Sequence, residues 1–208
     1  MWLIGTFPTL NLDIDYYPAL KKYLKTFGDR LNQDGKPGHR KKTNNKWFET
    51  QDNIAYHPEF EKEKIVWAET AEKIKTAIVP AGIYLSKTCF MLIGKNLKLI
   101  IAVANSLLID WFIRQSVHKL GEKGIYASEY FMEQLPIPPI TPKNQPIANQ
   151  IESIISQILT LTQSEDYLQN TAKQYKVREH ENQIDQLVYK LYGLTDEEIQ
   201  IVESYGTK

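Results

Sequence analysis

The sequence predicts an α+β protein: a mixed α/β domain whose short strands surround a buried helix, followed by a C-terminal helical hairpin. Three observations support this fold class. Short β-rich runs occupy the middle of the chain, helical periodicity occurs on both sides of them, and a proline-dense segment precedes the tail. A chain of 208 residues can bury a sizeable core, and its 42% hydrophobic and 24% charged residues are ordinary for a globular protein.

The first predicted element is an amphipathic helix over residues 17–32. Pro18 falls in the first turn, where proline is tolerated. A basic segment, "KPGHRKKTNNKWFE" (36–49), comes next, and glycine and proline within and before it predict a loop. The helix is predicted because apolar side chains recur every three or four residues, at Leu20, Tyr23, Leu24, Phe27 and Leu31.

Strands and a buried helix are predicted for the middle of the chain. Residues 64–69 ("KIVWAE") and 87–94 ("KTCFMLIG") are short β-rich runs. Residues 77–85 ("AIVPAGIYL") predict a strand, a turn and a second strand. From 97 to about 117 an apolar stripe indicates a helix with Asn96 as its N-cap, and we expect this helix to pack against the strands.

The proline-dense segment, "LPIPPITPKNQP" (135–146), predicts a domain boundary, because it continues neither a helix nor a central strand. We therefore expect one domain over residues 1–143 and a helical segment over residues 144–208. In the tail, Gly193 is expected to end a helix, and Thr195 with Glu198 forms a capping box that opens the last one.

The sequence offers little catalytic chemistry. His39, His57, His118 and His180 are scattered without metal-ligand spacing, and no glycine-rich phosphate loop is present. The single cysteine, Cys89, excludes an internal disulfide and is interpreted as a small core residue in a reducing compartment. The longest apolar stretch is interrupted by polar residues, so we expect a cytoplasmic protein that spans no membrane.

Charge is unevenly distributed along the chain. Residues 1–143 carry 20 Lys and Arg against 15 Asp and Glu, whereas residues 144–208 carry 5 against 10. Five cations lie in the 36–49 loop before its first acid, and aromatic residues follow them closely. Such a loop is suited to a polyanion, because lysine and arginine pair with phosphates and release condensed counterions.

Four blocks of the sequence resemble a known family in the same order. They are "KKTNNKWFETQDNIAYHPEFEKEKIVW", "LKLIIAVANSLLIDWFIR", "YFMEQLPIPPI" and "IDQLVYKLYGLTDEEI". The resemblance is to the C-terminal target-recognition domain of TaqI-like DNA adenine methyltransferases and of the fused restriction-modification enzymes called type IIG (Eco57I-like). It covers nearly the whole chain, and "ANS" before an aromatic helix, "LPIP" and "LYGLT" carry most of it.

The resemblance implies a non-catalytic module that reads double-stranded DNA, with the helical segment 144–208 as a spacer and docking element. It assigns phosphate contacts to Lys36, Arg40, Lys41, Lys42, Lys46, Lys119, Lys123 and Tyr126. It assigns base contacts to Lys73, Lys75, Thr76, Ser86 and Lys87, in the strand-turn-strand at 73–88. Few arginines are present, so bidentate guanine reading is hard to assign and the recognised sequence stays open.

The resemblance also implies catalytic domains elsewhere in a parent enzyme. No "NPPY" or "DPPY" motif occurs, and "WLIGTFP" resembles the middle of the family's recognition domain, so we expect a fragment of a longer protein. S-adenosylmethionine and Mg²⁺ would serve the parent's methyltransferase and nuclease domains, and no cofactor is expected in this segment. The alternative is a protein-interaction or dimerisation module that acts through the amphipathic tail helices, as in a specificity subunit; an enzyme with an unrecognised site is a third possibility.

Overall fold

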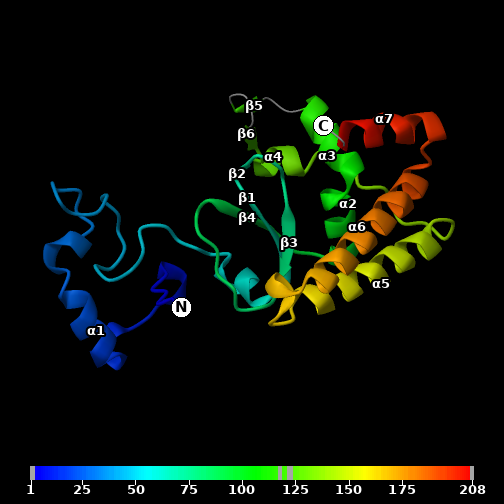
Figure 1. Ribbon diagram of the computed structural model, residues 1–208. Coiled ribbons are helices and arrows are strands. Elements are labelled where there is room, and N and C mark those ends of the chain that lie inside the picture. The colour runs from blue at the N-terminus through cyan, green and yellow to red at the C-terminus, as the bar shows by residue number, and fades with distance from the viewer. Residues whose placement is uncertain (1–2, 117–118, 121–123, 207–208) are drawn as a thin grey trace. The chain divides into compact units, whose positions relative to one another are not determined.

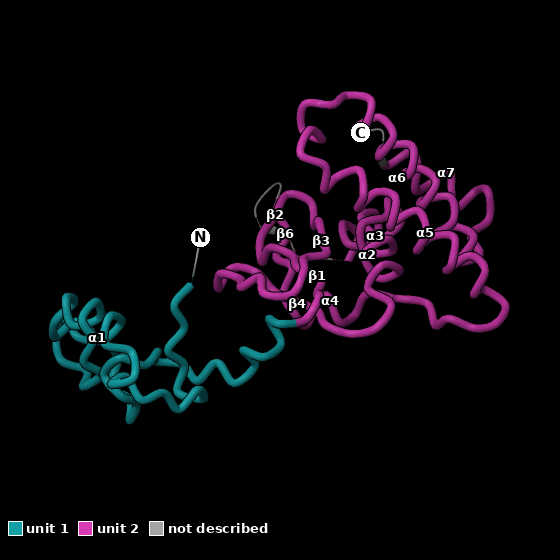
Figure 2. Tube along the Cα trace, turned by 90° about the horizontal axis from the view of Figure 1, so that it is seen from below, with its two compact units in different colours: residues 1–61 teal, residues 62–208 magenta. Residues whose placement is uncertain are grey.

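The chain folds into two compact units in a computed structural model that describes residues 3–116, 119–120 and 124–206 (Figure 1). Unit 1 comprises residues 1–61 and unit 2 residues 62–208 (Figure 2). The predicted α+β class is confirmed, with strands, a buried helix and C-terminal helices. The functional division expected after residue 143 stays a prediction, whereas the compact units divide at residue 61.

Unit 1 contains one α-helix and several short 3₁₀ turns. The helix, α1, spans Pro18–Lys25 and is shorter than the predicted 17–32, because Gly28 adopts a left-handed backbone conformation with φ of 58°. A 3₁₀ turn, Gly28–Leu31, follows and buries Leu31. The other 3₁₀ turns are Pro8–Leu10, Ile14–Tyr16 and His57–Glu61, and the buried apolar residues are Phe7, Ile14, Leu31, Phe48 and Phe60.

Unit 2 is built on a three-stranded sheet of order β3-β1-β4. The central strand β1 (Lys64–Ala68) pairs antiparallel with β3 (Thr76–Val79) and with β4 (Cys89–Leu92), which confirms the strands predicted at 64–69 and 87–94. Since both outer strands run against β1, they begin at the same end of the sheet, where β1 ends.

The hairpin predicted for residues 77–85 is wrong in its second half. Residues 76–79 form β3, but residues 83–85 form no strand. The next strand begins at Cys89, on the other side of β1. Residues 80–88 must therefore carry the chain across β1 and back along the sheet, so the Pro-Ala-Gly turn leads into a crossover connection and not into a paired strand.

A second small sheet has the order β2-β6-β5. Its strands are β2 (Thr70–Ala71), β5 (Lys119–Leu120) and β6 (Gly124–Tyr126), and every pairing in it is antiparallel. The register places Thr70 opposite Tyr126. Because β2 begins two residues after β1 ends, this sheet adjoins the end of β1 where β3 and β4 begin.

The helix predicted over residues 97–117 is divided into α2 (Leu97–Asn105) and α3 (Leu107–Ser116) by Ser106, whose backbone is extended. Asn96 precedes α2 as predicted, but its backbone is left-handed and its side chain makes no cap hydrogen bond. Most of α2 is buried, with Val103 fully enclosed, and it packs on β1 and β3. The expected buried helix is confirmed.

The tail is helical, as predicted. Its helices are α5 (Gln145–Thr162), α6 (Thr171–Tyr192) and α7 (Asp196–Gly206), and the short α4 (Glu129–Met132) precedes the proline-dense segment. Gly193 ends α6 with φ of 70°, and the capping box of α7 is formed: Thr195 N donates to Glu198 Oε2 at 2.8 Å and Glu198 N to Thr195 Oγ1 at 3.3 Å.

The tail helices belong to the same core as the sheet. Helices α5 and α6 lie side by side, and α5 packs on α2 (Figure 1). Ile151 of α5 and Val188 of α6 are 0% exposed and join one hydrophobic cluster with Leu99 and Ile65. The apolar faces that the sequence offered to a partner therefore pack against the core of the same chain, with part of their surface still accessible.

Asp185 of α6 holds the first turn of α3. Its Oδ1 accepts a hydrogen bond from Leu107 N at 2.8 Å. Burial disfavours the charged form and raises the pKa of Asp185, although this hydrogen bond and the charge of Lys73 act in the opposite direction.

We expect Asp185→Asn to change the pH dependence of stability. The pKa of Asp185 is higher in the folded chain than in the unfolded one. Between these two pKa values the folded chain binds more protons, so wild-type stability falls as pH rises through that range. Asparagine keeps an acceptor for Leu107 N but does not titrate. Urea denaturation between about pH 4 and pH 7 should show the difference in unfolding free energy moving in favour of the variant as pH rises. A difference that stays constant, or is matched by Glu165→Gln at an exposed tail position, would contradict this expectation.

Candidate nucleic-acid interface

The basic loop of unit 1 is folded around one buried side chain, Gln33. Its Nε2 donates to the carbonyl oxygens of Lys46 at 3.0 Å and Glu49 at 2.8 Å, and its Oε1 accepts from Thr43 Oγ1 at 2.5 Å. Thr43 N also donates to Gln33 O at 3.1 Å. These bonds tie both halves of the loop to residue 33, so the loop has a fixed path despite its lack of regular secondary structure.

Three of the five loop cations have partners inside unit 1. Lys36 Nζ lies 3.0 Å from Asp34 Oδ2, and Lys36 with His39 holds the pKa of Asp34 well below its usual range. Arg40 Nη1 donates to Glu49 O at 2.8 Å. Lys46 Nζ donates to Leu12 O at 2.9 Å. These side chains help to hold the loop, and a phosphate would compete with those contacts.

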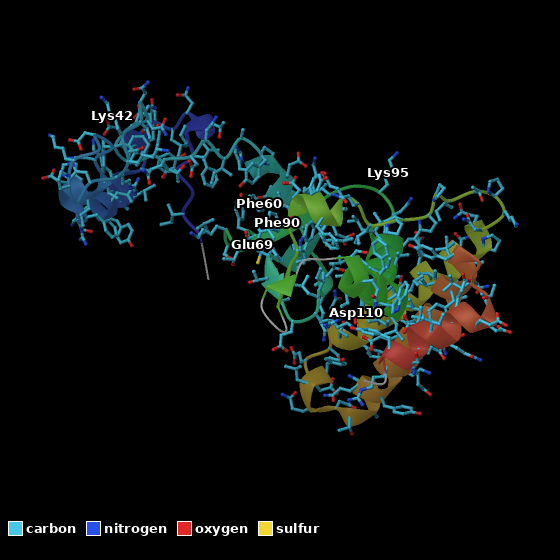
Figure 3. The ribbon with its side chains drawn as sticks, turned by 90° about the horizontal axis from the view of Figure 1, so that it is seen from above. Lys42, Phe60, Glu69, Phe90, Lys95 and Asp110 are labelled. Atoms are coloured by element: carbon cyan, nitrogen blue, oxygen red, sulfur yellow. The ribbon has the colours of Figure 1, made fainter. Side chains whose placement is uncertain are left out.

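Lys41 and Lys42 differ from the other three cations. Both are exposed, and within the described part of the chain neither side chain has an ion-pair or hydrogen-bond partner. Figure 3 labels Lys42. Their backbone is nevertheless held, since Arg40 N donates to Asn32 O at 2.9 Å and Gln51 Nε2 reaches Lys41 O at 3.5 Å. The loop therefore presents two adjacent uncompensated cations from an ordered backbone.

The aromatic residues after the loop mainly support it. Phe48 is buried, and Trp47 is half-buried with its ring edge-to-face on Phe48, at 5.7 Å between centroids. Tyr56 is exposed and contacts Phe60. Trp47 and Phe48 therefore explain why "WF" follows the cations, because these two rings anchor the chain where the loop ends.

In unit 2, several of the predicted base-reading residues gather at one end of the sheet. Thr76 lies opposite Trp67 and Cys89 opposite Ala68, so β3 and β4 both begin where β1 ends. Lys75 directly precedes β3, and Lys87 lies two residues before β4; both are exposed. Ser86 is also exposed, and its Oγ lies 2.9 Å from Thr88 Oγ1. Residues far apart in sequence are thus brought to one edge.

Glu69 joins the segments at this edge (Figure 3). Its N donates to Thr88 O at 2.9 Å, and its O accepts from Ala127 N at 2.8 Å. Its Oε1 accepts from Tyr126 Oη at 3.1 Å, a contact that raises the pKa of Tyr126. Tyr126, which was predicted to contact phosphate, is therefore brought to the same edge as Lys75 and Lys87.

Two other predicted base-reading residues serve the fold. Thr76 is buried, and its Oγ1 donates to Asn105 Oδ1 at 3.1 Å. Lys73 Nζ lies 3.2 Å from Asp110 Oδ2. The polar groups of both side chains are therefore engaged within the chain. Lys119, in β5, pairs through its backbone with Ile125 of β6, but its side chain and the whole of Lys123 lie outside the described residues.

Sequence reasoning missed the residues that organise this edge: Glu69, Asn105, Asp110 and Arg114. The available signal was charge in an apolar setting, since Asp110 and Arg114 interrupt the stripe of the predicted central helix. Asp110 is buried and meets two cations, Lys73 and, at 3.5 Å, Arg114 Nε. A carboxylate inside an apolar helix predicts such a partner but does not reveal which segment supplies it.

Neither a metal centre nor a membrane span is indicated where the structure describes the chain. Over residues 3–116, 119–120 and 124–206, no three side chains of the His, Cys, Asp or Glu type are grouped to hold a metal ion. Across the same residues, every helix is too short or too polar to cross a bilayer.

Comparison with known proteins agrees with the resemblance noted in the sequence. The model of the family described as the TaqI-like C-terminal specificity domain matches residues 13–137, more than half of the chain. The match includes the basic loop, the three-stranded sheet, α2 and α3, but it does not reach the fourth resembling block, residues 184–199. No curated protein matches the chain. On the strength of the family match, the chain belongs to the TaqI-like C-terminal specificity domains.

Proposed function

We propose that this chain reads the base sequence of double-stranded DNA for a type IIG restriction-modification enzyme. Membership in a family of specificity domains supports this, together with one structural observation. The exposed cations Lys75 and Lys87, 12 positions apart, lie at one end of the hydrogen-bonded three-stranded sheet. Lysine donors held on rigid elements suit the acceptor-rich edges of bases in the major groove.

Two groups of residues divide the work in this proposal. Lys41 and Lys42 contact phosphates, which contributes affinity without sequence information. Lys36, Arg40 and Lys46 mainly shape the loop that carries them. Base reading falls to Lys75, Ser86 and Lys87 in unit 2, and Tyr126 supports them through Glu69.

Chemistry belongs to other domains of the parent enzyme in this proposal. A methyltransferase domain would bind S-adenosylmethionine, and a nuclease domain would bind Mg²⁺. The described residues of this chain contribute recognition only. Incubating the chain with duplex DNA, S-adenosylmethionine and Mg²⁺ is expected to yield neither methylated nor cleaved product, and either product would overturn this part of the proposal.

The alternative, association through the tail helices, has less support. The apolar faces of α5 and α6 are buried in the core of unit 2, with Ile151 and Val188 inaccessible to solvent. Light scattering of the full chain should therefore give the mass of one copy. A stable dimer would favour the interaction module instead.

Selection from a pool of random duplexes tests the proposed function directly. The full chain is mixed with the pool, the bound fraction is sequenced, and enrichment is measured over several rounds. We expect one short motif to be enriched. Sequence-specific proteins typically bind their own site more tightly than non-specific DNA, by about 4–10 kcal/mol of binding free energy. Recovery of all sequences equally would refute sequence-specific reading.

We expect the double variant Lys41→Ala/Lys42→Ala to weaken binding to all duplexes alike. Each phosphate contact contributes about −0.9 to the slope of log affinity against log salt, so losing two should make the slope shallower by about 1.8. The wild-type slope should lie between about −1.8 for these two contacts and about −4.5 for all five loop cations. Titration of duplex DNA at several salt concentrations measures both values.

Lys190→Ala is the control for this experiment, since Lys190 is an exposed lysine on α6 in the acidic tail. It should leave the slope unchanged. An affinity that does not respond to salt, or a slope equal for the double variant and the control, would remove the phosphate role from the loop.

A further inference from the structure

The segment that carries Lys75 is held on both sides of this residue, so Lys75 projects from a backbone with fixed neighbours. Ile74 is buried in the core of unit 2. Lys73 reaches the buried Asp110, and Thr76 bonds to Asn105. Lys75 lies between these fixed neighbours and is exposed.

Asn105 holds Thr76 by three hydrogen bonds. Its Oδ1 accepts from Thr76 N at 2.8 Å and from Thr76 Oγ1 at 3.1 Å, and its Nδ2 donates to Thr76 O at 2.9 Å. A side-chain amide is matched to both backbone groups of one residue, because it offers an acceptor and a donor as a peptide group does. The pairing fixes the backbone directly after Lys75.

Arg114 holds the other side of the segment. Its Nη2 donates to Glu72 O at 3.0 Å, and its Nε lies 3.5 Å from Asp110 Oδ1. Asp110 Oδ2 lies 3.2 Å from Lys73 Nζ, so one buried carboxylate connects the arginine to the segment. Breaking such a pair is costly because the remaining charge stays desolvated.

Two sets of contacts, which we call clamps, hold the segment: those of Asn105 and those of Arg114 with Asp110. They come from the two helices on either side of the break between α2 and α3. Asn105 is the last residue of α2, and Ser106 opens α3 by accepting from Ile109 N at 3.3 Å. Asp110 and Arg114 then follow one turn apart on α3, on one face of the helix. The break is therefore what allows two helices to hold one short segment from two directions.

We infer that Asn105 and Arg114 are positioning residues for base reading: they fix residues 72–76 so that Lys75 is presented in one orientation. This inference rests on the proposed function. A lysine on a mobile loop must lose conformational freedom when it meets a base, whereas one on a clamped backbone loses less. The clamps should therefore set discrimination between sequences more than overall affinity.

Asn105→Ala tests the inference in the full chain. With the random duplex pool, the ratio of affinity for the best wild-type motif to affinity for the pool should fall about tenfold, within the range for one base contact. Affinity for the pool and its salt slope depend on Lys41 and Lys42 in unit 1, so both should stay within about twofold. A merely destabilised protein would lose binding to every duplex in proportion.

Arg114→Lys is the second variant, in case loss of Asn105 prevents folding. It keeps the charge near Asp110 but lacks the planar fork that reaches Glu72 O, so discrimination should fall in the same direction. The matched controls are Asn182→Ala and Arg178→Lys, both at exposed positions on α6. They should retain the wild-type motif and ratio.

Amide hydrogen exchange gives a readout that does not involve DNA. The Thr76 amide should be protected in wild type and should exchange faster in Asn105→Ala, because its acceptor is removed. Unchanged protection would overturn the clamp. Faster exchange with an unchanged discrimination ratio would overturn its role in reading. A wild type that enriches no motif would instead refute the proposed function, whichever result the exchange gives.

Discussion

Replacing Ile151 with alanine is expected to destabilise unit 2 by about 2–5 kcal/mol. Ile151 is 0% exposed on α5 and belongs to the cluster that includes Leu99 of α2 and Ile65 of β1. The substitution removes three carbons from a site where surrounding groups relax only partly, so the lost burial and the resulting cavity both count. Thermal or urea unfolding followed by circular dichroism measures the effect.

Ile201→Ala is the matched control, because Ile201 lies on α7 and is 56% exposed. The same change there should cost well under 1 kcal/mol, as surface substitutions usually cost less than about 0.5 kcal/mol. Equal effects at the two positions would mean that α5 does not share a core with the sheet. For the same reason, unit 2 should lose its fold in a chain that ends at Pro142, because α5 and α6 contribute to its core.

Lys75→Ala and Lys87→Ala are expected to change which sequences are bound. Each should reduce discrimination at one or two base pairs by about 1–3 kcal/mol and leave binding to random duplex nearly unchanged. The reason is geometric: both side chains project from the end of the sheet where the backbone is held by β1, Glu69 and Asn105. Selection from the random duplex pool, repeated with each variant, measures the change as lost information at particular positions of the motif.

Lys95→Ala separates position from charge in this experiment. Lys95 is also an exposed lysine of unit 2, but it follows β4 and so lies toward the other end of the sheet (Figure 3). Its loss should preserve the motif. If Lys95→Ala relaxed the motif while Lys75→Ala and Lys87→Ala only lowered overall affinity, base reading would have been assigned to the wrong end of the three-stranded sheet.

Local signals in the sequence predicted most of the elements. Apolar periodicity located α5 and α6, the capping box of Thr195 and Glu198 was confirmed atom by atom, and Gly193 ends α6 in the left-handed conformation that favours glycine. These predictions succeeded because each depends on residues within one or two helical turns. The helix predicted over residues 17–32 was longer than α1, because the spacing of apolar residues does not reveal the left-handed backbone at Gly28.

The site was predicted less completely than the fold. The sequence identified Lys75 and Lys87 as candidate readers, and their exposure at one edge agrees with that assignment, which stays a prediction. It also grouped all five loop cations together, whereas Lys36, Arg40 and Lys46 have partners within unit 1. Charge can be counted in a sequence, but whether a charge is free depends on groups such as Leu12 O, which lies 34 positions from Lys46.

The sequence by itself determined the α+β class, the helical tail and the cationic loop, because periodicity, capping and composition act over short distances. Only the tertiary structure decided that β3 and β4 lie on opposite sides of β1 and that α5 and α6 share a core with the sheet. It also decided that Asn105 hydrogen-bonds to Thr76, 29 positions away in the chain. Such contacts depend on the balance between loop-closure entropy and burial over the whole chain. No local pattern contains that balance.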